Sequence, residues 1–115
     1  MPVQMFHNPK CSKSRATLEL LREHGIEPEI FEYLKMELNE QRLREVLEML
    51  GIRPVELLRK KQKEFLETGL VASEATDDQL IAAMIDQPIL IERPIVINGG
   101  RAAVGRPPEN VLAIL

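Results

Sequence analysis

The chain has 115 residues, which is the usual size of one domain. Its 44% hydrophobic and 29% charged residues are typical of folded domains and exclude a disordered or fibrous protein. The net charge of −3 and the aromatic content of 3% disfavour nucleic acid and anionic lipid as partners, because basic patches and stacking aromatics recognise those ligands. We therefore expect a single domain, residues 1–115, with neither a nucleic-acid nor a membrane partner.

The sequence contains one cysteine, Cys11. One thiol forms no disulfide within the chain and supplies no multi-cysteine metal site. We expect no metal site, and separately we expect no bound cofactor. Neither a signal peptide nor a membrane-spanning run is recognisable, which favours a cytoplasmic location. In that reducing compartment a lone cysteine stays a free thiol.

The first third of the chain predicts a strand, a helix and a second strand. Residues 3–7 begin with apolar alternation and end at the turn-forming pair Asn8-Pro9. Apolar residues at helical spacing predict a helix over 12–24, and alternation predicts a strand over 29–34. A strand, helix and strand in close succession imply a right-handed parallel crossover.

Helices are predicted through the middle of the chain. Asn39 is a suitable N-cap for an amphipathic helix that reaches Leu50, and Pro54 suits the first turn of a short helix. A further helical piece is expected to reach Glu67. Thr76 then opens a capping box, Thr-x-x-Gln, for a helix that Pro88 ends. These elements form a predicted helical insertion over about residues 39–87.

The last part of the chain predicts strands and a closing helix. Residues 89–91 and 95–98 are rich in β-branched side chains, and Asn98-Gly99-Gly100 is a hairpin turn that leads into 101–104. A helix follows from Pro107 or Pro108 to Leu115. The order β-α-β, helices, β-β-α predicts an α/β domain with a thioredoxin/glutaredoxin-like fold and a helical insertion between its two halves.

Cys11 lies between a turn and the first turn of a predicted helix. Unpaired N–H groups and the helix dipole at such a position favour a thiolate, and the same groups bind oxyanions. Lys10, Lys13 and Arg15 add positive charge, and His7 ends the preceding strand. These polar neighbours favour a nucleophile over the alternative of a small buried hydrophobic residue.

Two motifs are missing around Cys11. Phosphatases place an arginine six residues after the nucleophilic cysteine, where this chain has Thr17. A self-contained redox motif is Cys-x-x-Cys, but position 14 is Ser14. A two-electron reduction by this chain therefore requires a second thiol from another molecule.

Five segments together resemble the ArsC-type, glutaredoxin-coupled arsenate reductases. They are His7-Asn8-Pro9-Lys10-Cys11-Ser12-Lys13-Ser14-Arg15, Leu57-Leu58-Arg59-Lys60, Thr76-Asp77-Asp78-Gln79-Leu80-Ile81, Pro88-Ile89-Leu90-Ile91-Glu92-Arg93-Pro94-Ile95-Val96 and Gly105-Arg106-Pro107. The resemblance covers essentially the whole chain. Its first segment is shared with Spx-like regulators, whereas the three arginines in their contexts make the match specific.

The resemblance implies a role for each matching residue. Cys11 would attack arsenate to form a thioarsenate adduct, and His7 would help to activate the thiol. Arg59, Arg93 and Arg106 would bind the arsenate oxygens, for which the planar donors of arginine are suited. Glutathione would be the co-substrate, and glutaredoxin would resolve the mixed disulfide. The supporting residues would be Ser14, Arg15 and Pro94, the last of which matches a cis-proline.

Other interpretations of these residues stay open at this level. Arg59 begins a basic run that is often a solvated helix face, and Arg93 and Arg106 each precede a proline, as in many surface turns. An Spx-like regulator that binds RNA polymerase is an alternative, although Ser14 replaces the second cysteine of redox-switched members. A glutathione-dependent thiol reductase with another substrate is the third possibility.

Overall fold

The computed structural model describes residues 2–115, whose contacts divide into two compact units. One unit combines the N-terminal part of the chain up to Met36 with residues 93–115. The other comprises residues 37–92 and contains all of the predicted helical insertion, 39–87. Both ends of the sequence therefore contribute to one unit, whereas the middle of the sequence forms the other.

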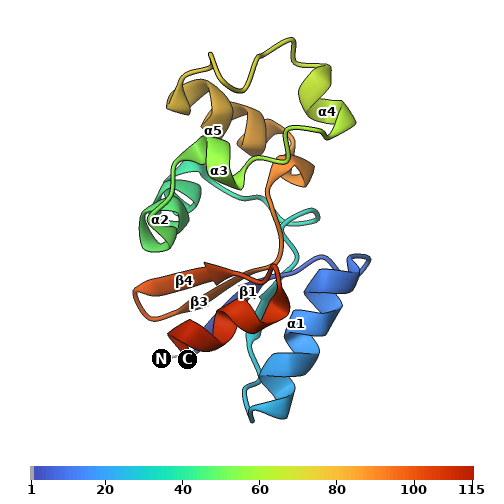
Figure 1. The fold of residues 1–115 in the computed structure, drawn as a ribbon, viewed down its shortest axis with the longest axis vertical. Helices are drawn as coiled ribbons and strands as arrows, with labels where there is room; N and C mark the ends of the chain where they lie inside the picture. Colours follow the sequence, from blue (N-terminus) through green and yellow to red (C-terminus); the bar gives the residue numbers. More distant parts are fainter. Residues whose placement is uncertain (1) are drawn as a thin grey trace. The chain divides into compact units, whose positions relative to one another are not determined.

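The unit made from the two chain ends is built on a four-stranded sheet (Figure 1). Its strands are β1 (Val3–Phe6), β2 (Glu29–Phe31), β3 (Ile95–Asn98) and β4 (Arg101–Val104), in the order β2-β1-β3-β4. β1 pairs in parallel with β2 and antiparallel with β3, and β3 pairs antiparallel with β4. Helix α1 (Ser12–Glu23) connects the parallel pair, so the predicted crossover is confirmed.

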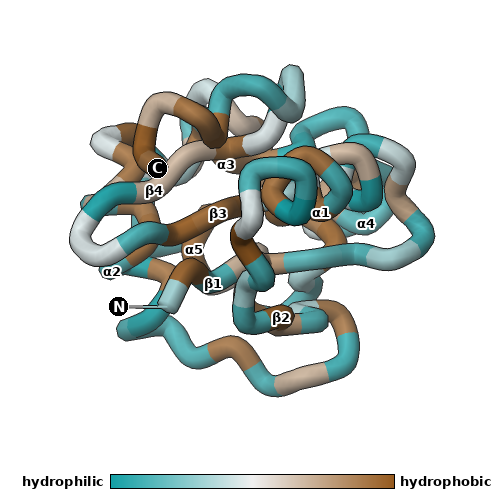
Figure 2. The backbone as a smooth tube through the Cα atoms, turned by 90° about the horizontal axis from the view of Figure 1, so that it is seen from below, coloured by the Kyte–Doolittle hydropathy of each residue, from teal (hydrophilic) through white to brown (hydrophobic). Residues whose placement is uncertain are grey.

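Two helical segments cover this sheet with apolar side chains. α1 packs against the C-terminal 3₁₀ helix η2 (Pro108–Ile114), drawn in red beside it in Figure 1. The core cluster consists of Met5, Leu21, Val96, Val111 and Ile114. Figure 2 shows that β3 is hydrophobic along most of its length, as expected for a strand inside a sheet. Burial of these side chains is the main force that holds α1 and the strand ends in place.

The unit of residues 37–92 is helical. It contains α2 (Glu40–Leu50), α3 (Pro54–Leu57), α4 (Lys63–Leu66), α5 (Asp77–Asp86) and the 3₁₀ helix η1 (Pro88–Leu90). Asn39 caps α2, and Thr76 and Gln79 form the predicted capping box of α5. α5 packs against α2, α3 and η1. The capping signals in the sequence therefore located these helix starts correctly.

Three predicted elements differ from the structure. β2 ends at Phe31 because Lys35 and Met36 donate their N–H groups to the Glu32 carbonyl, which turns the chain. The strand predicted over 89–91 is wrong: η1 occupies most of it, and Ile91 makes only an isolated bridge with Leu58 in the described chain. The apolar run there reflects burial, which periodicity alone does not distinguish from a strand. The closing helix is 3₁₀ rather than α.

Overall, the order of elements confirms the predicted α/β class with a thioredoxin-like arrangement. The strand that follows the insertion, β3, lies directly beside β1. Residues just after the insertion are thereby brought near the loop that follows β1. That loop contains Cys11.

Candidate active site

Cys11 lies in the loop between β1 and α1 and is the residue immediately before the helix. Its N–H donates to the Asn8 carbonyl at 3.0 Å, and its carbonyl accepts from the Arg15 N–H at 3.0 Å. The residue is 8% exposed. These bonds hold Cys11 at the N-terminus of α1, where backbone N–H groups of the first turn interact with its sulfur.

The surroundings of Cys11 favour its thiolate form. Burial raises the pKa of the thiol, but the remaining interactions outweigh burial, so the pKa lies below its ordinary value. The lowering comes from the Ser14 backbone N–H, from the hydrogen bond and charge of Arg93, and from the Lys13 backbone N–H. A thiolate is the nucleophilic form of cysteine, so this site is suited to attack on an electrophile.

Arg106 connects the sulfur to the backbone of Arg93. Its Nη2 donates to Cys11 Sγ at 3.9 Å, and its Nε donates to the Arg93 carbonyl at 2.8 Å. One planar guanidinium thus makes two hydrogen bonds in directions that its geometry fixes. Arg106 is thereby held beside the thiol.

Arg93 has donors that no protein group uses. Its Nε and Nη1 atoms are buried and lack a hydrogen-bond partner within residues 2–115. Buried donors are nearly always paired, so a buried donor without a protein partner is available to water, an ion or a ligand. Next to a thiolate at a helix N-terminus, two such donors on a permanent cation can bind a small oxyanion.

His7 acts on the residue that supports the thiol. It is 7% exposed at the end of β1, and its Nδ1 lies 2.6 Å from Ser14 Oγ, which also accepts from the Asn8 N–H at 3.0 Å. Burial lowers the pKa of His7; the charge of Glu32 opposes this and the charges of nearby arginines reinforce it. The neutral imidazole is therefore favoured at neutral pH. Ser14, fully buried, links His7 to the loop.

Arg15 and Pro94 occupy supporting positions in the same unit. Arg15 donates from Nη1 to the Pro9 carbonyl at 2.9 Å, which ties the first turn of α1 to the loop before it. Pro94 is buried, and the Arg93-Pro94 peptide bond is cis, as the resemblance implied. The Pro94 carbonyl accepts the Gly105 N–H at 2.9 Å.

Arg59 belongs to the helical unit, unlike every other predicted site residue. Its guanidinium lies 3.9 Å from Glu92 Oε1 and 3.5 Å from the Ile89 carbonyl. A hollow of about 440 Å³ adjoins it, lined by Leu58, Arg59, Lys60, Lys61, Gln62 and Glu92. The convergence of Arg59 on Cys11 stays a prediction, whereas Arg93 and Arg106 both interact with the Cys11 side chain.

No site role was predicted from the sequence for three residues that shape this unit, namely Asn8, Thr17 and Gly105. Asn8 shapes the loop: its side-chain Oδ1 accepts the Lys10 N–H at 3.0 Å. The Asn-Pro pair was a recognisable signal for this turn. No local signal marks Thr17 or Gly105, since their close approach joins distant parts of the sequence.

The described residues contain neither a metal-binding group of side chains nor a membrane-spanning helix. Across residues 2–115, no three His, Cys, Asp or Glu side chains are grouped as a metal site requires. Within the same range no helix has the length and apolar character to cross a membrane. That the chain has no bound metal or cofactor stays a prediction.

Comparison with known proteins agrees with this geometry. The model of the ArsC family matches residues 6–114. "Arsenate reductase" of Neisseria meningitidis serogroup A is 43% identical over 98% of this chain and 97% of its own length. "Uncharacterized protein YfgD" of Escherichia coli K12 is 47% identical over 98% of this chain and 96% of its own length.

Solved structures agree as well. "Arsenate reductase from Vibrio cholerae" is 46% identical, with a TM-score of 0.94 over 100% of this chain and 98% of that chain. The family match spans the loop of Cys11, strands β2, β3 and β4, and the segments of Arg93 and Arg106. The chain belongs to the ArsC family.

Proposed function

We propose that this protein reduces arsenate to arsenite, with Cys11 as the nucleophile. The observation that carries the proposal is the Arg93 guanidinium, whose buried Nε and Nη1 atoms have no hydrogen-bond partner within residues 2–115 and which interacts with a Cys11 thiol of lowered pKa. Arsenate is a tetrahedral oxyanion of the kind that such donors bind. Relatives named arsenate reductase, similar over the full chain, support the same reaction.

In the proposed first step the Cys11 thiolate attacks arsenic and forms a sulfur–arsenic bond, and one arsenate oxygen leaves as water after protonation. Arg93 and Arg106 donate to the oxygens and stabilise the charge that develops on them. Arg59 would supply a third guanidinium. His7, through Ser14, keeps the loop in the conformation that presents the thiolate.

Reduction of As(V) to As(III) requires two electrons, and two thiols that form one disulfide supply them. Cys11 is the only thiol in the chain, so a second must come from outside. We infer that glutathione provides it and that glutaredoxin resolves the resulting mixed disulfide. The net change is then one arsenate and two thiols converted to one arsenite, one disulfide and one water. A reducing cytoplasm is the compartment in which these donors are available.

A coupled assay tests this proposal. Wild type and Cys11→Ser are mixed with arsenate, glutathione, glutaredoxin and glutathione reductase, and NADPH oxidation is followed. We expect turnover in the wild type, loss of turnover in Cys11→Ser, and loss when either glutathione or glutaredoxin is omitted. Mass spectrometry of the peptide that contains Cys11 should show an arsenic adduct when glutathione is omitted. Equal rates for wild type and Cys11→Ser would overturn the proposal.

The alternatives predict different results. A thiol reductase with another substrate would consume NADPH with a disulfide substrate but not with arsenate. An RNA polymerase-binding regulator would retain polymerase in a pull-down with Cys11→Ser and without arsenate. No contact in the described residues favours either alternative over arsenate reduction.

A further inference from the structure

Gly105 lies where three segments of the sheet unit approach each other closely. A Cβ atom placed on Gly105 would lie 2.5 Å from Thr17 Oγ1 and 2.8 Å from Pro94 Cγ. Real Cβ atoms essentially never approach other heavy atoms within 3.0 Å. A side chain at position 105 therefore requires one of the three segments to move.

The side chains next to Gly105 have little freedom to move away from an added Cβ atom. Thr17 is fully buried on α1, its β-branched side chain has restricted rotamers, and its Oγ1 donates to the Lys13 carbonyl at 2.9 Å. Pro94 is buried, and its ring has little freedom. Displacement would therefore fall on the backbone at Gly105 itself.

The requirement for glycine here is one of space. Four glycines in the described chain have positive φ, namely Gly25, Gly51, Gly69 and Gly99, and Gly105 is not among them. Alanine can adopt the backbone conformation at position 105, but its methyl group has no room there. Gly100 has neither requirement: its φ is not positive, and nothing lies within 4 Å of a Cβ placed on it.

The backbone at Gly105 holds the segment that carries Arg106. The Gly105 N–H donates to the Pro94 carbonyl at 2.9 Å, and the next residue, Arg106, donates from Nε to the Arg93 carbonyl at 2.8 Å. From this anchored position Arg106 Nη2 reaches Cys11 Sγ at 3.9 Å. A shift of the chain at position 105 would move the Arg106 donors away from the Arg93 carbonyl and the Cys11 sulfur.

We propose that Gly105 is a positioning residue: its lack of a side chain lets residues 105–106 lie against Thr17 and Pro94, which places the Arg106 guanidinium on the Cys11 sulfur. The role of this placement in turnover rests on the proposed arsenate reduction. The placement of Arg106 on the sulfur does not depend on that reaction, because the reactivity of the Cys11 thiol reports the placement directly.

The first experiment compares Gly105→Ala with the matched control Gly100→Ala. The rate of alkylation of Cys11 by iodoacetamide is measured against pH, and kcat/KM for arsenate is measured in the coupled assay. In Gly105→Ala we expect the alkylation profile of Cys11 to differ from the wild-type profile and kcat/KM to fall about tenfold, since the hydrogen bond from Arg106 to the sulfur is lost. Gly100→Ala should behave as wild type in both measurements.

The second experiment asks whether Gly105 acts through Arg106. If it does, Gly105→Ala should change the alkylation profile and kcat/KM by less than about twofold in an Arg106→Ala background, because the interaction is already absent. The same loss in both backgrounds would overturn the proposal, as would a wild-type alkylation profile in Gly105→Ala. If the wild type reduces no arsenate, the proposed function fails, and the alkylation profiles still decide the role of Gly105.

A third variant distinguishes a loss of Arg106 positioning from a general loss of folding. Thr17→Ala/Gly105→Ala removes the Thr17 atoms that the new methyl group would meet, so it should recover part of the wild-type alkylation profile. Thermal unfolding is recorded for every variant. If neither Gly105→Ala nor the double variant unfolds cooperatively, Gly105 serves folding rather than the arginine, and the proposal is overturned.

Discussion

Arg106 Nη2 donates a hydrogen bond to Cys11 Sγ at 3.9 Å, although 95 positions separate the two residues in sequence. The antiparallel pairing of β1 with β3 makes this possible, because it places the start of β3 beside the loop that follows β1. Arg93 precedes β3, and Arg106 follows β4, which is paired to β3. Two arginines from the last quarter of the chain therefore lie at the N-terminus of α1.

Arg106→Lys is expected to lower kcat/KM for arsenate by about tenfold or more. Lysine keeps the charge but lacks the planar fork that donates to the Arg93 carbonyl and to the Cys11 sulfur together. Arg101→Lys is the matched control, since Arg101 is exposed and donates to the Ala113 carbonyl on the hairpin side. Equal losses in the two variants, measured in the coupled assay, would contradict this explanation.

Arg93→Met is expected to raise the free energy of unfolding while it abolishes turnover. The substitution removes two buried donors without partners, each of which destabilises the fold by roughly 1–3 kcal/mol, and keeps a long side chain in the same space. Urea denaturation should therefore show a gain of about 1 kcal/mol or more.

Ligand binding provides a check on the same residue. Arsenate should raise the melting temperature of the wild type, because a ligand that binds the native state stabilises it, and should leave Arg93→Met unchanged. A lower stability of Arg93→Met together with a retained arsenate shift would refute the assignment of these donors to the oxyanion.

The lowered pKa of Cys11 links protein stability to pH. A thiol whose pKa is lower in the folded state binds fewer protons there than in the unfolded state between the two pKa values, so stability rises with pH in that window. The contribution is complete above the unfolded pKa of about 8.5 and is lost as pH falls through the folded value. The difference in unfolding free energy between wild type and Cys11→Ser should therefore grow as pH rises toward 8.5 and then level off. A difference that shrinks over this range would show that the folded thiol has a raised pKa.

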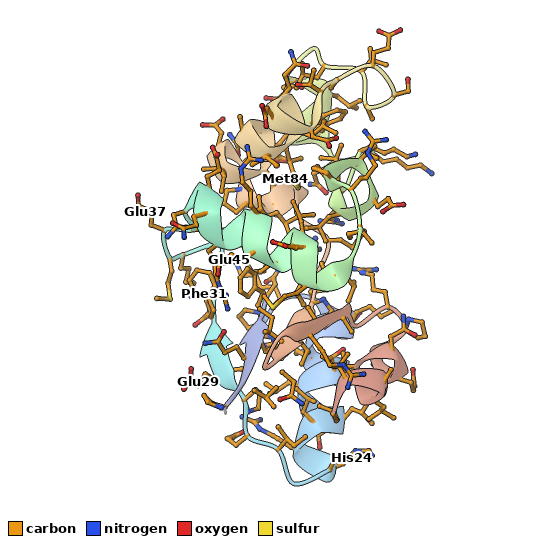
Figure 3. All side chains as sticks on the ribbon, turned by 90° about the vertical axis from the view of Figure 1, so that its left-hand side faces the viewer. His24, Glu29, Phe31, Glu37, Glu45 and Met84 are labelled. Atoms are coloured by element: carbon orange, nitrogen blue, oxygen red, sulfur yellow. The ribbon has the colours of Figure 1, made fainter. Side chains whose placement is uncertain are left out.

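His7 should destabilise the fold in acid. Burial lowers its pKa in the folded state, so the unfolded chain takes up a proton first as pH falls below about 6.5, and stability is lost until the folded pKa is reached. Stability curves over this range should be flatter for His7→Gln than for wild type. The control is His24→Gln, because His24 is exposed at the end of α1 opposite to Cys11 (Figure 3) and its replacement leaves the buried pair of His7 and Ser14 in place.

Local signals predicted much of the fold because they act within a few residues. The capping box at Thr76, the cap at Asn39 and the Asn8-Pro9 turn each mark the start or end of an element through hydrogen bonds to nearby backbone groups. The segment 89–91 shows the limit of such reasoning. Its apolar residues indicated a strand, but Pro88 begins a 3₁₀ turn, and burial alone accounts for the composition.

The candidate site likewise has some features that the sequence determines and others that depend on the tertiary structure. The placement of Cys11 directly before a helix depends on one short segment, and the absence of a second thiol depends on a residue count. The sequence by itself therefore determined a single cysteine at a helix N-terminus, and from it we predicted a nucleophile that would need an external thiol donor. Only the tertiary structure decided which cations reach the sulfur, and how. Arg93 and Arg106 arrive through the pairing of β1, β3 and β4, and the clearance at Gly105 against Thr17 and Pro94 that admits Arg106 depends on atoms that are neighbours in space but not in sequence.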